Sequence, residues 1–537
     1  MSIIIFQLKE SESMRVIVKV FSILLSLVSV YAEVKMPKIF SDGMVLQRDI
    51  PVKIWGEAEP NSAIEVCFNG QALITKTSAT GKWSVFLEPM GASKKPEIMA
   101  VLENGKNAKI IKDVLVGEVW IASGQSNMEI PISMCDSSGA VRERADYPMI
   151  RYFYQPQVIS RTPQKDSPKG SHWFACTGKS AQHMSGVAFH FAEALMKDLD
   201  VPVGILYSAS GATEMAAWLP LEYASKSPYL EKYVSDFLKE VAGYDAKAYQ
   251  KALAEYNQRT AEFEKKCEAA KRENRKAPIR QWDDLPPNEV SPRLHFKSPT
   301  FHYNTTISPI VGYGIRGVIW YQGEADSRDN KRGEFARTFK ILVDSWRGLW
   351  NMPEMPFLYV QLASFAFEGD ADGDKWAQTR WIQSQCLKEI SHSGMANIID
   401  TGLKDNIHPT DKETVGLRLE KIALKDVYGK KGISAYGPAF NKAKYFDDKV
   451  ELLFYTFGGK LTTKGEPRGF ELKINGKWEK GIPEVKGARK VVVRRISNDG
   501  KIEGVRYLWK NWASPDVWLY NDDSLPALSF INERALH

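Results

Sequence analysis

Five short apolar runs, separated by segments with helical patterns, constrain the fold of the middle of this chain. A strand that is apolar on both of its sides is expected where helices cover both faces of a parallel sheet. Strands that alternate with helices along the chain are typical of such α/β domains. We therefore expect an α/β domain with a parallel sheet at residues 114–430. The runs are Val119–Ala122, Val203–Tyr207, Gly317–Tyr321, Phe357–Val360 and Ala396–Ile399.

The chain on either side of this region has the pattern of antiparallel strands. Ile64–Phe68 alternates between apolar and other residues, and Asn69-Gly70 then supplies a tight turn. Asn475-Gly476 predicts a second hairpin towards the other end. The length of 537 residues is enough for roughly two to four domains. We expect a β-sandwich-like N-terminal domain at 33–113 and a C-terminal β-domain at 431–537.

A helical insertion is predicted inside the α/β domain, at about residues 222–300. Apolar or small residues recur there at spacings of four and three, which indicates one face of an amphipathic helix. Lys, Arg and Glu are mixed on its other faces, and this favours a solvated helix over an arm that binds nucleic acid. Cys267 lies on the apolar face, so we interpret it as a packing residue. The face consists of Tyr249, Leu253, Tyr256, Thr260, Phe263, Cys267 and Ala270.

The amino terminus has the pattern of a secretory signal. Basic residues precede the apolar run Val20–Val30, and Val30-Tyr31-Ala32 ends on a small residue that suits a signal peptidase. The run is shorter than the about 20 residues of a membrane span. The alternative is a buried N-terminal strand or helix. We expect the signal peptide to lie within residues 1–32, with translation starting at Met14 and the mature chain beginning near Glu33. The product is then expected to be exported to the periplasm or extracellular space without a membrane span.

Composition excludes several classes of protein. Apolar residues make up 44% and charged residues 26%, which is ordinary for a globular chain and excludes general disorder. The net charge of +7 is spread along the sequence, so we expect no nucleic-acid partner. Five cysteines, an odd number, do not make a disulfide scaffold. The sequence has no His-Glu-x-x-His, Cys-x-x-Cys or acidic calcium loop, and we expect no metal or other cofactor.

A candidate nucleophile follows the first apolar run. Ser126 lies in the segment Gly124–Met128, directly after the predicted strand, at the edge where open α/β sheets bind ligands. A serine hydroxyl becomes a strong nucleophile only when a base accepts its proton. Met128 replaces the second glycine of the Gly-x-Ser-x-Gly turn, so the local pattern fits a helix-capping serine as well as a nucleophile.

The candidate base lies far downstream, in the segment Asp405-Asn406-Ile407-His408-Pro409. Asp405 precedes His408 by three residues, a spacing that lets the carboxylate fold back onto the imidazole. Such a contact would hold the tautomer whose other nitrogen accepts the serine proton. An aspartate and a histidine at this spacing also occur by chance on protein surfaces, so this motif alone is not specific.

Together these two motifs resemble the first and last blocks of the SGNH (GDSL-like) hydrolases. Val116–Trp120 and Trp320–Glu324 are more closely similar to the sialate O-acetylesterase family, of the bacterial secreted type. The resemblance implies a flavodoxin-like, three-layer α/β/α domain with a parallel sheet, flanked by the two β-domains. It extends towards both ends of the chain through Phe40–Gln47, Pro51–Gly56, Trp518–Asn521 and Leu525–Ala527.

The resemblance also assigns roles to particular residues. Ser126 would attack an acetyl carbonyl, His408 would act as general base and then as general acid, and Asp405 would orient the imidazole. The backbone N–H groups of Ser126 and Gly211 and the side-chain amide of Gln322 would form the oxyanion hole.

One segment departs from the family pattern. Many relatives have Trp-Gly-Gly-Thr where this chain has Ser210-Gly211-Ala212-Thr213. The oxyanion N–H could therefore belong to Gly211 or to Ala212. In the second case the backbone must avoid conformations that only glycine tolerates. The missing tryptophan bears on the substrate pocket more than on the mechanism.

Side chains near these motifs are candidates for binding a sugar. Trp218 and Tyr321 could stack on a pyranose ring, although aromatic residues beside buried strands more often belong to the core. Glu324 could hydrogen-bond sugar hydroxyls or brace the loop that carries Gln322.

The sequence therefore predicts a secreted carboxylic ester hydrolase that removes O-acetyl groups from sialic acid through an acetyl-enzyme. An acetylxylan esterase, or an esterase for another acetylated glycan, would use the same residues. A third hypothesis is a carbohydrate-binding protein with an inactive middle domain, in which the flanking β-domains bind the ligand.

Overall fold

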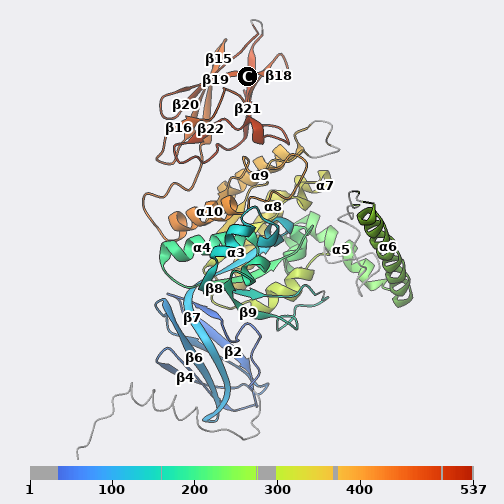
Figure 1. Ribbon diagram of the computed structural model, residues 1–537, viewed down its shortest axis with the longest axis vertical. Coiled ribbons are helices and arrows are strands. Elements are labelled where there is room, and N and C mark those ends of the chain that lie inside the picture. Colours follow the sequence, from blue (N-terminus) through green and yellow to red (C-terminus); the bar gives the residue numbers. More distant parts are fainter. Residues whose placement is uncertain are drawn as a thin grey trace, which may run out of the picture.

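Three regions follow one another along the longest dimension of the protein (Figure 1). Strands near the N-terminus lie at one end, helices and strands together form the middle, and C-terminal strands lie at the other end. The structure is a computed structural model that describes residues 34–534, apart from 159, 274, 276–277, 279–297, 367–369, 371–372 and 498–499. The predicted leader at 1–32 and part of the predicted insertion lie outside the described residues.

The middle region is built on a sheet of seven strands. They are β7 (Lys106–Gly124), β8 (Asp146–Tyr154), β9 (His172–Thr177), β10 (Val203–Ala209), β11 (Gly317–Tyr321), β12 (Phe357–Val360) and β13 (Ser393–Ala396). Their order across the sheet is β13-β12-β11-β7-β10-β8-β9. Neighbours are parallel from β13 to β8, and β9 is antiparallel at the edge. The prediction of an α/β domain with a parallel sheet is confirmed.

Two details of the sheet differ from the prediction. The last apolar run was expected to be a strand from Ala396, but β13 ends at that residue. Asn397 instead leaves the strand, and its side-chain amide donates to the carbonyl of Pro526 at 2.9 Å. The strands β8 and β9 were not predicted, because both carry exposed residues among the buried ones, and β9 also lies at the edge of the sheet.

Helices cover both faces of the central sheet. On one face lie α4 (Gly186–Leu199) and α10 (Glu413–Ile422), and on the other lie α8 (Phe335–Trp350) and α9 (Lys375–Glu389). Successive side chains of a strand point to opposite faces. Ile319 accordingly packs in the core with α4 and α10, and Trp320 packs against Trp346 of α8. The result is the predicted three-layer α/β/α arrangement.

One long strand, β7, joins the N-terminal region to the central sheet. Up to Val116 it pairs with β6 (Ser93–Glu103), and from Glu118 it pairs with β10. The predicted domain boundary between residues 113 and 114 therefore falls within a single strand. The other strands of this region are β1 (Val45–Gln47), β2 (Val52–Glu57), β3 (Ala63–Phe68), β4 (Gln71–Lys76) and β5 (Lys82–Leu87).

The C-terminal region forms its own core, which includes Leu452, Val505 and Phe530. Its strands are β14 (Ala439–Tyr445), β15 (Lys449–Tyr455), β16 (Leu461–Thr463), β17 (Phe470–Ile474), β18 (Lys477–Lys480), β19 (Ile482–Lys486), β20 (Lys490–Arg494), β21 (Ile502–Tyr507), β22 (Leu519–Asn521) and β23 (Phe530–Glu533).

Both predicted hairpins are present. Asn69-Gly70 connects β3 to β4 with φ angles of 48° and 71°, and Asn475-Gly476 connects β17 to β18 with φ angles of 49° and 78°. Positive φ at both positions is what a two-residue hairpin turn requires, and Asn-Gly tolerates it best.

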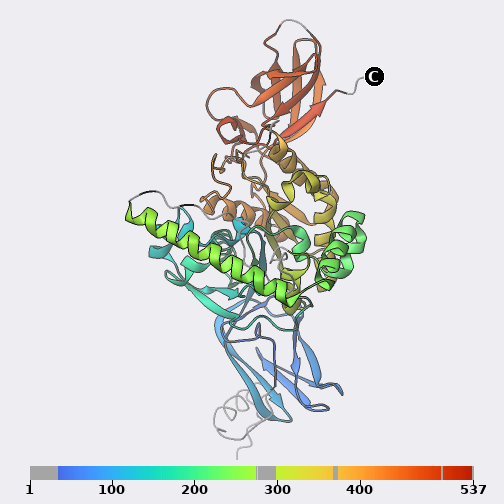
Figure 2. The same ribbon diagram turned by 90° about the vertical axis from the view of Figure 1, so that its right-hand side faces the viewer.

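The predicted insertion contributes two helices, α5 (Pro228–Ala242) and α6 (Ala246–Arg272). In Figure 2, α6 is the long helix that crosses the middle region on the side facing the viewer. Residues of its predicted apolar face, such as Tyr249 and Phe263, are half-buried, whereas the neighbouring Lys265 and Glu264 are exposed. The prediction of an amphipathic helix is confirmed. Shorter helices elsewhere are α2 (Ser126–Glu129), α3 (Ser138–Arg144) and α7 (Asp329–Arg332).

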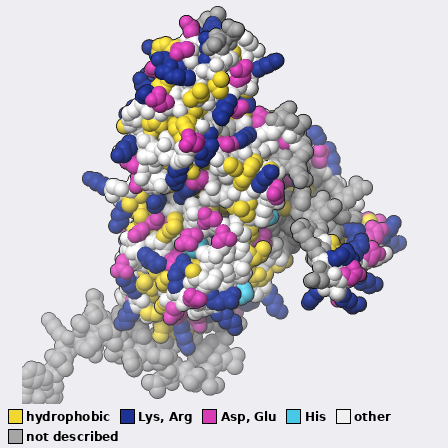
Figure 3. Space-filling view, turned by 45° about the horizontal axis from the view of Figure 1, so that its top comes forward, with side chains coloured by type: hydrophobic (Ala, Val, Ile, Leu, Met, Phe, Trp, Pro, Cys, Tyr) yellow, Lys and Arg dark blue, Asp and Glu magenta, His cyan; other side chains and the backbone are white. Residues whose placement is uncertain are grey.

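Charge is mixed over the surface. On the face shown in Figure 3, basic and acidic side chains are interspersed. Among the described residues, no helix is both long and apolar enough to cross a bilayer.

Candidate active site

The serine turn begins where β7 reaches the edge of the sheet. Gly124 has a φ of +134°, and a Cβ at this position would lie 2.2 Å from the carbonyl oxygen of Tyr321. Only glycine fits so close to the neighbouring strand. The N–H of Gln125 donates to that same carbonyl at 2.9 Å. Ser126 then opens α2, half-exposed at the sheet edge.

A histidine from the other end of the domain meets this serine. His408 lies in the loop between β13 and α10, and its Nε2 is 2.8 Å from Oγ of Ser126. The backbone N–H of His408 donates to Oδ1 of Asn406 at 2.9 Å, which shapes the loop. Burial, and secondly the charge of Lys412, lower the pKa of His408 to about 4. The imidazole is therefore neutral at ordinary pH and can accept the serine proton.

The structure does not show the predicted contact between Asp405 and His408. Asp405 is exposed, and no hydrogen bond joins its carboxylate to the imidazole, although both residues are described. The loop turns through Asn406 rather than Asp405, because the Asn406 side chain accepts the N–H of His408. Within the described part of the chain, Nδ1 of His408 is left without a hydrogen-bond partner.

Gly211 lies beside the serine, as predicted, but its N–H is occupied. A Cβ on Gly211 would be 3.6 Å from the Cβ of Ser126 and 2.9 Å from Oε2 of Glu129. The Gly211 N–H donates to the Glu129 carboxylate. Burial raises the pKa of Glu129, and the hydrogen bonds from Gly211 and Gln157 oppose that rise. Ala212 has a φ of +58°, so the chain places alanine in a conformation that favours glycine.

The amide of Gln322 does not point its donors at the serine. Its Nε2 donates to the carbonyl of Thr213 at 3.1 Å and to Oδ2 of Asp326 at 2.6 Å. A primary amide has two N–H bonds, and both are used here. The prediction of Gln322 as an oxyanion donor is therefore not met in this geometry. The carboxyl of Asp326 is 5% exposed, and burial, with the charge of Glu214 second, raises its pKa to about 7.

The three predicted sugar-binding residues lie in the interior. Trp218 and Tyr321 are both 0% exposed, so neither ring is free to stack on a sugar. Trp218 stacks on His302 at 4.7 Å between ring centres. Glu324 is also buried and accepts a hydrogen bond from Asn127. The assignment of Trp218 and Tyr321 to sugar binding was therefore wrong. For Glu324, the alternative role of bracing the loop that carries Gln322 fits its buried position better.

Sequence reasoning missed the polar residues beneath the serine. Lys412 is buried, and its Nζ donates to Oδ1 of Asn127 at 2.5 Å. Asn127 was part of the recognised motif but received no role, and Lys412 lies four residues after His408. The spacing alone does not reveal this contact, because the lysine reaches a residue 285 positions away.

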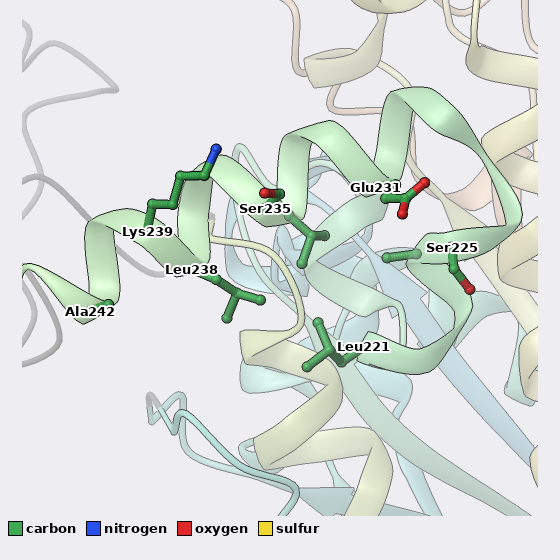
Figure 4. Close-up of a pocket in the computed structure, with 9 residues that line it drawn as sticks. Leu221, Ser225, Glu231, Ser235, Leu238, Lys239 and Ala242 are labelled. Atoms are coloured by element: carbon green, nitrogen blue, oxygen red, sulfur yellow. The ribbon is translucent and has the colours of Figure 1, made fainter.

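A pocket of about 460 Å³ lies elsewhere, along α5 (Figure 4). Its lining includes Leu221, Val234 and Leu238, and none of the predicted site residues contributes to it. It is therefore separate from the candidate active site.

Residues 292–424 match the family model described as carbohydrate esterase, sialic acid-specific acetylesterase. The resemblance to the sialate O-acetylesterase family is confirmed. The sialate O-acetylesterase of Mus musculus is 26% identical to this chain over 531 residues, which cover 91% of this chain and 92% of the mouse protein. That of Homo sapiens is 25% identical over 533 residues, 91% of each chain.

A solved structure agrees with these matches. The carbohydrate acetylesterase from Xanthomonas citri has a TM-score of 0.76 to this structure and is 29% identical, with 93% of this chain and 99% of that chain covered. Family model, relatives and fold thus indicate that this chain is a carboxylic ester hydrolase, similar to carbohydrate esterases.

Proposed function

We propose that this protein is an exported serine esterase that removes O-acetyl groups from sialic acids. The observation that carries the catalytic part is the 2.8 Å contact between Oγ of Ser126 and the neutral imidazole of His408. The substrate is supported by the matched family model and by the relatives from mouse and human, which are named sialate O-acetylesterases. Residues 1–32 support export, because they have the pattern of a cleavable signal.

The reaction proceeds through an acetyl-enzyme. His408 accepts the proton of Ser126 as Oγ attacks the acetyl carbonyl, and a tetrahedral oxyanion forms. The intermediate collapses when the imidazolium returns the proton to the sugar oxygen, and the deacetylated sugar leaves. Water then attacks the acetyl-serine with His408 again as base, and acetate and free Ser126 are released.

The proposed oxyanion donors are the backbone N–H groups of Ser126 and Gly211. Gly211 already contacts an acidic side chain, since its N–H donates to Glu129. The oxyanion of the intermediate would take the place of that carboxylate. A carboxylate can occupy the same position as an oxyanion, because both accept charge-assisted hydrogen bonds from N–H donors.

Asp405 is proposed to orient His408 once substrate is bound. It is three residues from the imidazole on an exposed loop, and Nδ1 of His408 is open to receive it among the described contacts. Catalytic hydrogen bonds are often unformed in the free enzyme and tighten in the complex with substrate.

The test is acetate release by purified wild-type protein and Ser126→Ala. Ser126→Ala should reduce acetate release from O-acetylated sialic acid to the buffer background. Ser123→Ala is a matched control, since Ser123 lies three residues before Ser126, at the end of β7, and its buried hydroxyl makes no hydrogen bond within the described structure. The control should keep wild-type activity. Equal turnover by wild type and Ser126→Ala would refute the mechanism.

Substrate and export need separate measurements. Acetylated xylan, assayed beside O-acetylated sialic acid, tests the alternative glycan, and a higher kcat/KM on xylan would replace the proposed substrate. The non-catalytic hypothesis requires that no acetylated glycan is turned over. Expression of the full chain, followed by mass spectrometry of the secreted product, should give an N-terminus near Glu33; an intact leader would refute export.

A further inference from the structure

A buried lysine lies directly beneath the serine and histidine. Lys412 is 1% exposed and precedes α10. Its side chain packs against Gly186 at the start of α4, where a Cβ would lie 2.9 Å from the Cβ of Lys412. Its Nζ lies 5.4 Å from the ring centre of Tyr321, a cation–π distance. A lysine is rarely placed in such an interior without partners, so its contacts require an explanation.

Asn127 connects this lysine to the histidine loop. Its Oδ1 accepts the Lys412 ammonium at 2.5 Å, and its Nδ2 donates to the carbonyl of Ile407 at 3.1 Å and to Glu324. Ile407 directly precedes His408, and Asn127 directly follows Ser126. Hydrogen bonds from Lys412 to Asn127 and from Asn127 to Ile407 therefore connect the serine turn to the histidine loop.

We propose that Lys412 is a positioning residue for the esterase reaction, which holds His408 against Ser126 through Asn127 and places its positive charge beside the histidine loop. The inference rests on the proposed function and deepens it. Lys412 touches neither reacting atom in the structure. It acts through Asn127 on geometry, and through space on the charge of His408.

The charges around the pair favour this role. The charged or titratable groups that act on Lys412 are Cys135, Glu324 and Asp411, and each of them favours its protonated form. Burial outweighs them and lowers the pKa of Lys412 to about 8, so the ammonium is charged at neutral pH. Burial is the main cause of the low pKa of His408, and the second cause, among the described residues, is the charge of Lys412.

The direction of the effect follows from like charges. An ammonium near the imidazole disfavours the imidazolium, so His408 remains a base at lower pH. Removal of the charge should raise the pKa of His408 and move the acid limb of kcat/KM to higher pH. Loss of the contact with Asn127 should also loosen the histidine loop and lower kcat, because small misplacements of a base are costly.

The experiment compares wild type with Lys412→Met and Lys412→Arg on p-nitrophenyl acetate across the pH range. Lys412→Met should move the acid limb of kcat/KM upwards by about one pH unit. It should also lower kcat at pH 7 by about tenfold to a hundredfold, with KM changed much less. Lys412→Arg keeps the charge, so its acid limb should stay in place. Lys421→Met, which changes a lysine within α10, the helix that Lys412 precedes, is the matched control and should behave as wild type.

A second measurement does not depend on activity. The pKa of His408 is read by NMR in protein with labelled histidine, assigned with His408→Gln, and it should rise in Lys412→Met even if no substrate is turned over. Failure of the proposed function would leave wild type and Ser126→Ala equally inactive but would not alter this titration. If Lys412→Met does not fold, as judged by circular dichroism, Lys412→Gln is used in its place, because glutamine keeps a polar end in the site. An unchanged titration of His408 in a folded variant would overturn the proposal.

Discussion

Oγ of Ser126 and Nε2 of His408 lie 2.8 Å apart, although 282 positions separate the two residues in the chain. The sheet creates this contact. Ser126 follows β7 and His408 lies in the loop after β13, and both strands belong to the same parallel set. Parallel strands end at one edge, where the segments that follow them come together. The pairing is therefore a property of the fold, which neither local motif specifies alone.

The low pKa of His408 predicts activity that persists into the acidic range. Burial, with Lys412 second, lowers this pKa to about 4, so the base form predominates above that pH. Since kcat/KM reports the free enzyme, it should decrease only as the pH falls through about 4. The profile is measured with p-nitrophenyl acetate, with a stability check at each pH. An acid limb near about 6.5, the ordinary value for histidine, would contradict this prediction.

The variant Asp405→Asn tests whether Asp405 acts on His408 in the complex with substrate and not in the free enzyme. We expect kcat to fall by roughly two to four orders of magnitude, because the imidazolium loses its partner. The acid limb of kcat/KM should stay where it is, since Asp405 does not contact His408 in the free protein. Steady-state kinetics against pH measure both quantities. Glu413→Gln, an exposed acid-to-amide change nearby, is the control. A variant with wild-type kcat would remove Asp405 from the mechanism.

Much of the fold could be predicted because its strands carry strong local signals. The run in β10 is buried at every position, and such continuous apolar runs indicate a central parallel strand. The strand β8 and the edge strand β9 escaped prediction because half-exposed strands mix polar and apolar residues. The position of β13 was predicted too far along the chain, because Ile398 and Ile399 are apolar and buried but pack outside the sheet.

Only those residues of the site that belong to sequence motifs could be predicted. Ser126 and His408 meet as expected, yet residue type could not reveal whether Trp218 faces substrate or core. Both surfaces favour aromatic rings, and only the helix layers show that Trp218 is covered. Lys412 had no local signal, because its importance comes from the contact with Asn127 across the domain.

Gln322→Ala should affect stability more than catalysis. The amide stabilises the ionised carboxylate of Asp326, whose pKa is about 7. Its loss should lower the free energy of unfolding by about 1–3 kcal/mol. The loss should be larger at pH 8 than at pH 6, because the hydrogen bond favours the ionised form.

Urea unfolding at the two pH values tests this effect. Gln361→Ala is the control, since that buried amide donates to the carbonyl of Arg380 and should show no such pH dependence. We expect kcat of Gln322→Ala to fall less than tenfold. A fall of about a hundredfold or more, typical of a lost oxyanion donor, would restore Gln322 to that role.

Ala212→Gly should stabilise the protein. Ala212 has a φ of +58°, where an L-residue with a Cβ is strained and glycine is not. The gain is partly offset because glycine has more freedom in the unfolded chain. We expect the free energy of unfolding to rise by about 0.5–1 kcal/mol, with kcat little changed because the N–H of residue 212 is retained. Urea unfolding followed by tryptophan fluorescence measures the change. Ala217→Gly, at a buried alanine that does not share the positive φ, should instead destabilise. If both variants lose stability to the same extent, the strain at Ala212 is absent.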